Sequence, residues 1–155
     1  MASGAIVCPT ICEESRRRKK GKMRIALEGP INACADTECI PWRNKVIETL
    51  GDIACFHNPM DFDCRGKERE MELALIEYDT TGLTQSDIVL VMAEKPGWGT
   101  AMAVQMAHDM HKHVVCVCSS DKPSPWLRNR TTVMCKTLDE AISHIRSLPN
   151  YVQVQ

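Results

Sequence analysis

The sequence predicts an α/β fold in which a five-stranded parallel sheet is flanked by helices, as in Rossmann and flavodoxin-like domains. One observation is that short apolar runs alternate with amphipathic stretches of helical periodicity from Met23 onward. Another is the composition, since 155 residues with 44% hydrophobic and 25% charged residues suit one globular core. Strands that alternate with helices pair through right-handed crossovers, so the expected sheet is parallel.

The first half of the predicted domain holds two strands and two helices. Met23–Glu28 is an apolar run that stops at Gly29-Pro30, which predicts a strand. Pro41–Leu50 has its apolar residues on one side and Gly51 after it, which predicts a helix with a glycine stop. Ile53–Phe56 predicts a second strand. Arg69–Tyr78, with a few residues beyond it, predicts a second helix.

The second half continues the alternation. Asp87–Ala93 is apolar after its first residue, which is typical of a strand buried on both faces. Thr100–Met110 predicts a helix and His113–Cys118 a fourth strand. Thr131–Cys135 predicts a fifth strand and Leu138–Ile145 a last helix.

The expected organisation is one domain over residues 23–148, with tails at 1–22 and 149–155. The first tail contains the basic run Arg16-Arg17-Arg18-Lys19-Lys20-Gly21-Lys22, which has no apolar period. We interpret it as a solvated arm, and a nuclear-import or polyanion-binding patch remains the alternative.

Charge, hydropathy and cysteine content exclude several classes of protein. A formal net charge of −1 argues against a protein that coats nucleic acid. The longest apolar runs, such as Ile88–Ala93, fall far short of the roughly 20 residues of a membrane span. The nine cysteines are odd in number and form no CxxC pair, which favours thiols that pack as small hydrophobes in a reduced compartment. The first twelve residues lack a secretory-signal pattern, so we expect a cytoplasmic protein with nuclear entry left open.

Ligands of open α/β sheets bind beyond the carboxyl ends of the strands, which directs attention to three segments. These are residues 28–32, 58–63 and 94–100. The last, Glu94-Lys95-Pro96-Gly97-Trp98-Gly99-Thr100, is a glycine-rich turn that leads into a helix. Its N–H groups suit a phosphate, a ribose hydroxyl or a carboxylate, although its glycines could simply make the turn. It is neither GxGxxG nor a P-loop, which disfavours ordinary dinucleotide binding and NTP hydrolysis.

Four segments between Met23 and Ile145 resemble motifs of one enzyme family. They are Leu27-Glu28-Gly29-Pro30, Pro59–Gly66 (PMDFDCRG), Tyr78–Ile88 (YDTTGLTQSDI) and Gly99–Ala107 (GTAMAVQMA). In this order they are similar to the xxGP, PxDxxxxG, NDxxxIxxxD and GTxxExGxA motifs of the nucleoside 2-deoxyribosyltransferase family and its nucleotide N-glycosidase relatives. The resemblance implies cleavage of the N-glycosidic bond of a (deoxy)nucleoside or its 5′-monophosphate through a glycosyl-enzyme, without a cofactor or a metal.

The chain departs from the family at the nucleophile. The family has a glutamate where this sequence has Ala103. A methyl group cannot attack C1′, so the resemblance implies a chain that binds its substrate and does not turn it over. Two explanations stay open: a glutamate replaced by design to trap a ligand, which we favour, or a natural pseudoenzyme. Ala103 could also be an ordinary helix residue in a chain that shares only the fold.

The resemblance assigns Asp79 to the leaving base, as the acid that protonates or orients it. The structural alternative is an aspartate that closes a helix near Thr80-Thr81-Gly82. Asp61 and Asp63 are either turn residues or acceptors that face the base.

The resemblance also implies a set of substrate-binding residues and an assembly. The set comprises Gly29, Pro30, Asn32, Asp61, Asp63, Gly97, Trp98, Gly99, Thr100, Met102, Ser124 and Arg128. Trp98 would cover a base or a sugar. The segment around Ser124 and Arg128, with Arg130 beside it, would reach a 5′-oxygen or phosphate in a neighbouring subunit. We therefore expect a homo-oligomer with shared active sites, a small-molecule nucleoside or nucleotide as ligand, and neither membrane nor nucleic acid as partner.

Other functions remain in view. His108 and His111 share a helix face, but no carboxylate or cysteine completes a metal site with them and His113. A nucleotide-binding pseudoenzyme would use the same pocket without chemistry. A phosphoribohydrolase of the cytokinin-activating type also has a glycine-rich GT turn, but its PGGxGTxxE loop is only partly present in Pro96–Thr100.

Overall fold

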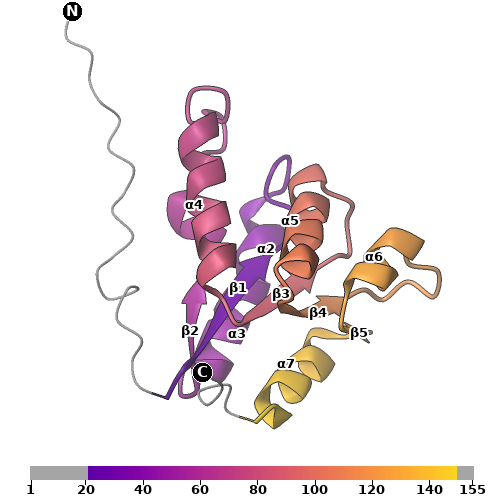
Figure 1. The fold of residues 1–155 in the computed structure, drawn as a ribbon. Coiled ribbons are helices and arrows are strands. Elements are labelled where there is room, and N and C mark those ends of the chain that lie inside the picture. Colours follow the sequence, from indigo (N-terminus) through magenta and orange to yellow (C-terminus); the bar gives the residue numbers. More distant parts are fainter. Residues whose placement is uncertain (1–20, 150–155) are drawn as a thin grey trace, which may run out of the picture.

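The computed structural model describes residues 21–149 and confirms the α/β fold. Its sheet has five parallel strands in the order β2-β1-β3-β4-β5 (Figure 1). The strands are β1 (Met23–Glu28), β2 (Ala54–His57), β3 (Ile88–Met92), β4 (His113–Val117) and β5 (Val133–Cys135). The basic tail predicted at 1–22 lies outside the described residues except for Gly21 and Lys22, and so does most of the tail at 149–155.

The helices follow the predicted order with three additions. They are α2 (Asp36–Cys39), α3 (Pro41–Leu50), α4 (Glu72–Gln85), α5 (Trp98–Asp109), α6 (Pro125–Arg130) and α7 (Leu138–Ser147), with a 3₁₀ turn η1 (Pro59–Phe62) after β2. The short elements α2, α6 and η1 were not predicted, because they have too few residues for a periodic pattern to emerge.

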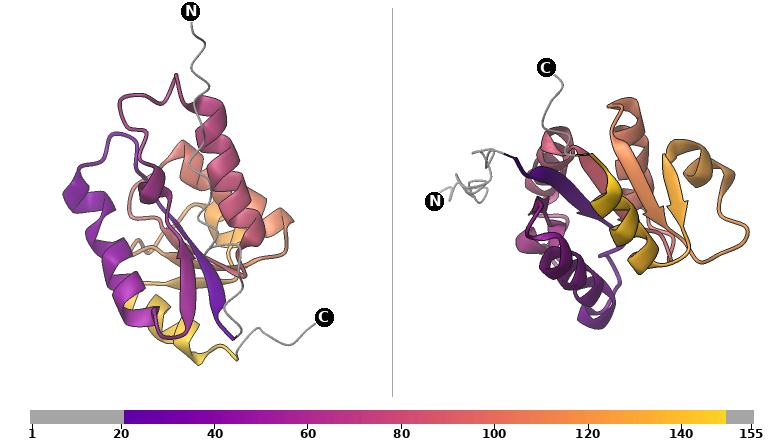
Figure 2. Two further views of the ribbon diagram at one scale, coloured as in Figure 1. Left: turned by 90° about the vertical axis from the view of Figure 1, so that its left-hand side faces the viewer. Right: turned by 90° about the horizontal axis from the view of Figure 1, so that it is seen from below.

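Two apolar clusters hold the layers together, one on each face of the sheet. The α3/α7 cluster joins Val46 and Leu50 of α3 and Ile142 and Ile145 of α7 to alternate strand residues such as Leu27. The α4/α5 cluster joins helices α4 and α5 to the intervening strand residues. Its buried members are Ala26, Leu83, Val89, Val91, Ala103, Val104, Ala107, Val114, Cys116 and Cys118. Successive side chains of a strand point to opposite faces, so α4 and α5 share one face and α3 and α7 the other (Figure 2).

Helix α4 differs most from its prediction. It begins at Glu72, after the predicted start at Arg69, and continues to Gln85, further than the few residues expected beyond Tyr78. Thr80, Thr81 and Gly82 are weak helix formers, but Leu83 beyond them is buried in the α4/α5 cluster. Tertiary packing therefore carries the helix through a segment of low intrinsic propensity.

Within residues 21–149, no helix combines the length and the apolar character that a bilayer crossing requires.

Candidate functional site

The chain order reverses between β1 and β3, which makes the crevice at their carboxyl ends the expected ligand site of an open α/β sheet. Gly29, directly after β1, brings the walls of this crevice together. A Cβ at residue 29 would stand 3.0 Å from the Trp42 ring and 3.2 Å from Cβ of Met92. Glycine therefore allows α3, β1 and β3 to converge where Glu28 ends the first strand.

Glu28 carries a carboxyl group into the interior. Its side chain is 6% exposed, and its Oε1 is buried without a hydrogen-bond partner among the described residues. It alternates with Leu27 and so shares the sheet face of Ala26, the side of α4 and α5. Burial and, to a smaller extent, the nearby charge of Asp79 together raise the pKa of Glu28 to about 8 against the opposing charge of Arg43. The group is therefore mostly protonated at neutral pH.

Asp79 lies in the middle of α4, on the side of the helix that faces the sheet. The alternative prediction, that Asp79 closes the helix near Thr80-Thr81-Gly82, is therefore wrong. Its Oδ1 is buried and lies 3.7 Å from Nε2 of His57, the last residue of β2. This distance is too long for a hydrogen bond and leaves an electrostatic contact. The His57 ring in turn lies against Tyr78, with ring centroids 4.7 Å apart. The end of β2 and one turn of α4 thus place an imidazole and a carboxyl group side by side.

Ala103 lies on α5, which packs beside α4 on the same face of the sheet. Its methyl group is 8% exposed and belongs to the α4/α5 cluster with Ala26 and Val91. Neither of its helical neighbours on this face, Val104 and Ala107, carries a functional group. Helix α5 therefore offers no carboxylate to the crevice.

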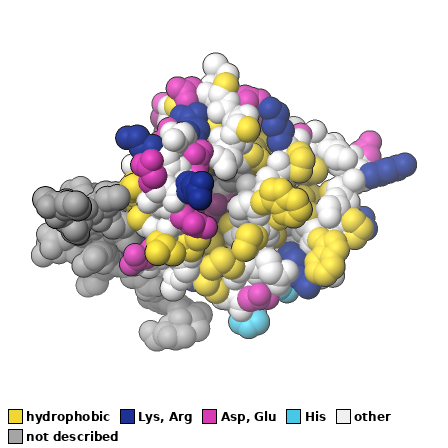
Figure 3. Space-filling view, turned by 90° about the horizontal axis from the view of Figure 1, so that it is seen from above, with side chains coloured by type: hydrophobic (Ala, Val, Ile, Leu, Met, Phe, Trp, Pro, Cys, Tyr) yellow, Lys and Arg dark blue, Asp and Glu magenta, His cyan; other side chains and the backbone are white. Residues whose placement is uncertain are grey.

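A cavity of about 810 Å³ adjoins the crevice at the start of α5. It lies over the carboxyl ends of β3 and β4, between the segments that lead into α5 and α6. Its lining residues include Ala93, Gly97, Trp98, Thr100, Ser124, Trp126 and Arg130. Trp98 is 91% exposed, and hydrophobic side chains gather on this face of the molecule (Figure 3). The volume suits a small ligand. The cavity lining includes neither Glu28 nor Asp79, so the binding surface is distinct from these two carboxyl groups.

Known structures with the same architecture include enzymes of nucleoside chemistry. A 2-deoxyribosyltransferase from Bacillus psychrosaccharolyticus matches with a TM-score of 0.62 at 12% identity, over 81% of this chain and 92% of that one. The CMP N-glycosidase BcmB of Clostridium botulinum matches with a TM-score of 0.53 at 13% identity, over 79% and 98%. The chain shares their fold. A conserved protein of Enterococcus faecalis matches with a TM-score of 0.61 at 10% identity, over 81% and 98%. No family model and no curated protein matches the sequence.

Within this 2-deoxyribosyltransferase fold, part of the predicted binding set is brought together. Gly97, Trp98, Thr100 and Ser124 line the cavity, and Pro30 lies close to Gly97, where a Cβ would meet its ring at 3.3 Å. Gly99, Met102 and Arg128 lie outside the cavity lining, as does Asn32, and all four are exposed. Arg130 lines the cavity, where it accompanies Lys95 and Lys122 as a source of positive charge.

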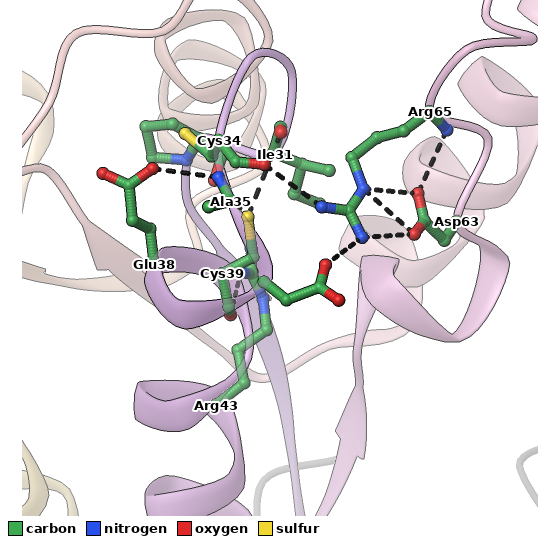
Figure 4. A network of polar contacts seen from close by, with 10 residues as sticks. Ile31, Cys34, Ala35, Glu38, Cys39, Arg43, Asp63 and Arg65 are labelled. Carbon is green, nitrogen blue, oxygen red and sulfur yellow. Dashed lines mark hydrogen bonds and ion pairs between the residues drawn. The ribbon is translucent and has the colours of Figure 1, made fainter.

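Asp61 and Asp63 are engaged within the chain. Asp63 accepts hydrogen bonds from the Arg65 guanidinium, which also reaches Asp36 at 2.6 Å and the carbonyl of Cys34 at 3.1 Å (Figure 4). The bonds from Arg65 lower the pKa of Asp63. Asp61 accepts from Nδ2 of Asn58 at 3.0 Å. Arg65 therefore ties the segment after β1 to the segment after β2.

Sequence reasoning missed Glu28 and His57 as functional candidates. Both could have been selected from the sequence, because each is a titratable side chain at the end of a short apolar strand, where the crevice was expected. Among the described residues, no group of three His, Cys, Asp or Glu side chains is arranged to hold a metal ion.

Proposed function

We propose that this protein binds a nucleoside or its 5′-monophosphate in the cavity at the start of α5 and acts on the N-glycosidic bond. The observation that carries the proposal is the position of Asp79, whose buried Oδ1 is held beside His57 at the carboxyl end of β2. An acid–base group at the scissile bond lowers the barrier, either by protonating the departing nucleobase or by activating the group that attacks C1′. The shared fold with a 2-deoxyribosyltransferase and a CMP N-glycosidase supports this assignment.

The phosphate of a 5′-monophosphate would lie at the first turn of α5. Helix α5 has 12 residues, and its first N–H groups begin directly after Gly97. A helix N-terminus attracts an anion through its free N–H groups and its dipole. Lys122 and Arg130 add positive charge around the same cavity, which Glu94 also lines and where Lys95 is paired with Glu38. Ser124 or Arg128 from a partner subunit would approach the phosphate in the proposed homo-oligomer.

Position 103 of this chain cannot supply the nucleophile for a two-step route through a glycosyl-enzyme. Ala103 presents a methyl group, and covalent catalysis at C1′ needs a carboxylate. This same observation favours a second candidate function, a nucleotide-binding protein without turnover. The two candidates share the ligand and differ in whether free base appears.

Calorimetric titration tests the shared part of the proposal. Cytidine, deoxycytidine, adenosine and deoxyadenosine are each compared with their 5′-monophosphates. We expect at least one monophosphate to bind about tenfold more tightly than its nucleoside, which corresponds to roughly 1.4 kcal/mol. Inorganic phosphate should compete with the monophosphate. Equal affinities within every pair would contradict the phosphate position, and no binding by any of the eight ligands would contradict the function.

A further inference from the structure

Glu28 is a buried carboxyl group that the preceding function does not use. It stands at the carboxyl end of β1, in the crevice between β1 and β3. Its side chain is 6% exposed, and its buried Oε1 accepts no hydrogen bond within residues 21–149. A buried polar group without a partner destabilises a fold, so its presence at a crevice points to a role toward a ligand.

The charged groups around Glu28 do not neutralise it by a direct ion pair. From α3, Arg43 donates to the carbonyl oxygens of Cys39 at 2.6 Å and Gly29 at 3.1 Å, which commits its guanidinium largely to the backbone. From α4, Asp79 adds a second carboxyl group. From β2, His57 lies beside Asp79. Helix α5 contributes Ala103 on this face and no charge.

We propose that Glu28 is the second carboxyl group of the site and the acid–base partner of Asp79, in place of the carboxylate that position 103 lacks. This inference rests on the proposed function. It replaces the two displacements at C1′ of the glycosyl-enzyme route by a single displacement, because Glu28 and Asp79 would act together on a water molecule and a leaving base.

The proposed step is a direct hydrolysis. The oxygen of water forms a bond to C1′ while the bond between C1′ and the base nitrogen breaks. Asp79 takes a proton from the attacking water, and Glu28 gives its proton to the departing base nitrogen. The products are the free base and the sugar or sugar phosphate. Proton exchange with solvent then restores both side chains to their starting forms. Burial and the nearby Asp79 keep the pKa of Glu28 near 8, which supplies the acid form at neutral pH.

A single displacement inverts the configuration at C1′, whereas a glycosyl-enzyme route retains it. A β-nucleotide should therefore give the α-anomer of the sugar phosphate as the first product. This signature separates the Glu28 route from the route through a carboxylate at position 103. A purely structural role for Glu28 would not produce it.

The test compares the unaltered protein with Glu28→Gln and with Glu48→Gln. The glutamine keeps the shape of the neutral acid and cannot give up a proton, and Glu48 is an exposed residue of α3. The substrates are CMP, dCMP, AMP and dAMP. Base release is followed by chromatography, the first anomer by proton NMR, and affinity by calorimetry. Glu28→Gln should lower base release by about 100-fold or more with the dissociation constant changed less than threefold. Glu48→Gln should match the unaltered protein, and the first product should be the α-anomer.

The pH profile adds a second readout. Base release by the unaltered protein should fall as pH rises through about 8, since Glu28 loses its proton there. The residual rate of Glu28→Gln should lack this limb. Equal rates for the unaltered protein and Glu28→Gln, or a β-anomer as first product, would overturn the inference. Tight binding without any base release would overturn it while the binding function stands. Failure to bind any of the four nucleotides would overturn both.

Discussion

Gly82 of α4 lies against the imidazole ring of His57 so closely that a Cβ at residue 82 would stand 2.2 Å from the ring atoms Cδ2 and Cγ. Because residue 82 has no side chain, the backbone of α4 packs directly against His57 at the end of β2. Asp79 lies three residues earlier, on the same face of the helix. The glycine thus sets the 3.7 Å separation between the Asp79 carboxyl and the His57 ring.

Gly82→Ala should push α4 and His57 apart. Overpacking of this kind costs about 1–3 kcal/mol of unfolding free energy. Urea titration followed by circular dichroism measures the loss, and calorimetry should show weaker nucleotide binding. Gly99→Ala is the matched control for the stability measurement, because a Cβ there meets nothing within 4 Å and residue 99 lies in α5. That variant should gain about 0.5–1 kcal/mol. Equal stabilities for the two variants would contradict the close packing.

Glu28→Gln should stabilise the protein most at alkaline pH. The folded chain holds the Glu28 proton up to a pKa of about 8, whereas the unfolded chain releases it near the ordinary value of 4.5. Between these values the folded state binds more protons, so this group lowers the free energy of unfolding as pH rises. The glutamine lacks that penalty. We expect a gain of several kcal/mol at pH 8, at most about 5 kcal/mol from 1.36 kcal/mol per pKa unit, and little gain at pH 4. Urea titrations of both proteins across this range make the comparison, and a pH-independent difference would contradict it.

Ala103→Glu should open the two-step route. A carboxylate on α5 can attack C1′, and loss of a covalent nucleophile ordinarily costs several orders of magnitude in rate. We expect base release from the preferred nucleotide to rise by about 10³-fold or more, with retention of configuration. Ala103→Gln is the control for size. Both variants should lose stability, because position 103 is 8% exposed within an apolar cluster. Equal base release by the two variants would show that position 103 is not the nucleophile position.

Asp79→Asn, added to Ala103→Glu, should lower turnover far more than affinity. The amide keeps the shape of the carboxyl group but cannot exchange a proton in the reaction. A loss of about 10²–10⁴-fold in kcat with a small change in KM is expected. Steady-state kinetics with Asp109→Asn as the matched exposed control measures it. Near-normal turnover would leave Asp79 with a structural role beside His57.

The protein should form a homodimer or a higher even-numbered oligomer with closed symmetry. Large apolar side chains are exposed on three helices, with Leu73 of α4 at 83%, Met102 of α5 at 66% and Trp126 of α6 at 73% exposure. Burial of such side chains in a subunit interface is favourable. Light scattering on the purified protein gives the mass directly. Trp126→Ala should weaken the assembly, and a monomer at all concentrations would contradict the shared-site arrangement.

The sequence predicts much of where the candidate site lies, but it predicts less of the chemistry of the side chains there. The glycine-rich turn at 97–100 was predicted because glycines before a periodic apolar helix are visible in one short window. The cavity does adjoin that turn. His57 was not selected, because nothing in its immediate neighbours indicates that a glycine on a distant helix would bring Asp79 beside it. The sequence left two interpretations of Asp63, a turn residue or an acceptor that faces the base. Only the structure reveals the hydrogen bonds that Asp63 accepts from Arg65.

The sequence by itself determined the alternation of strands and helices, the parallel pairing and the strand ends where a ligand would bind. These features depend on local periodicity and on topology rules that apply to every α/β chain. Only the tertiary structure decided that Ala103 lies in the apolar α4/α5 cluster and that β1 brings a buried carboxyl group near enough to Asp79 to feel its charge. The physical reason is that burial, and with it the protonation of Glu28, depends on side chains contributed by α3, α4 and β2, which approach one another only when the chain folds.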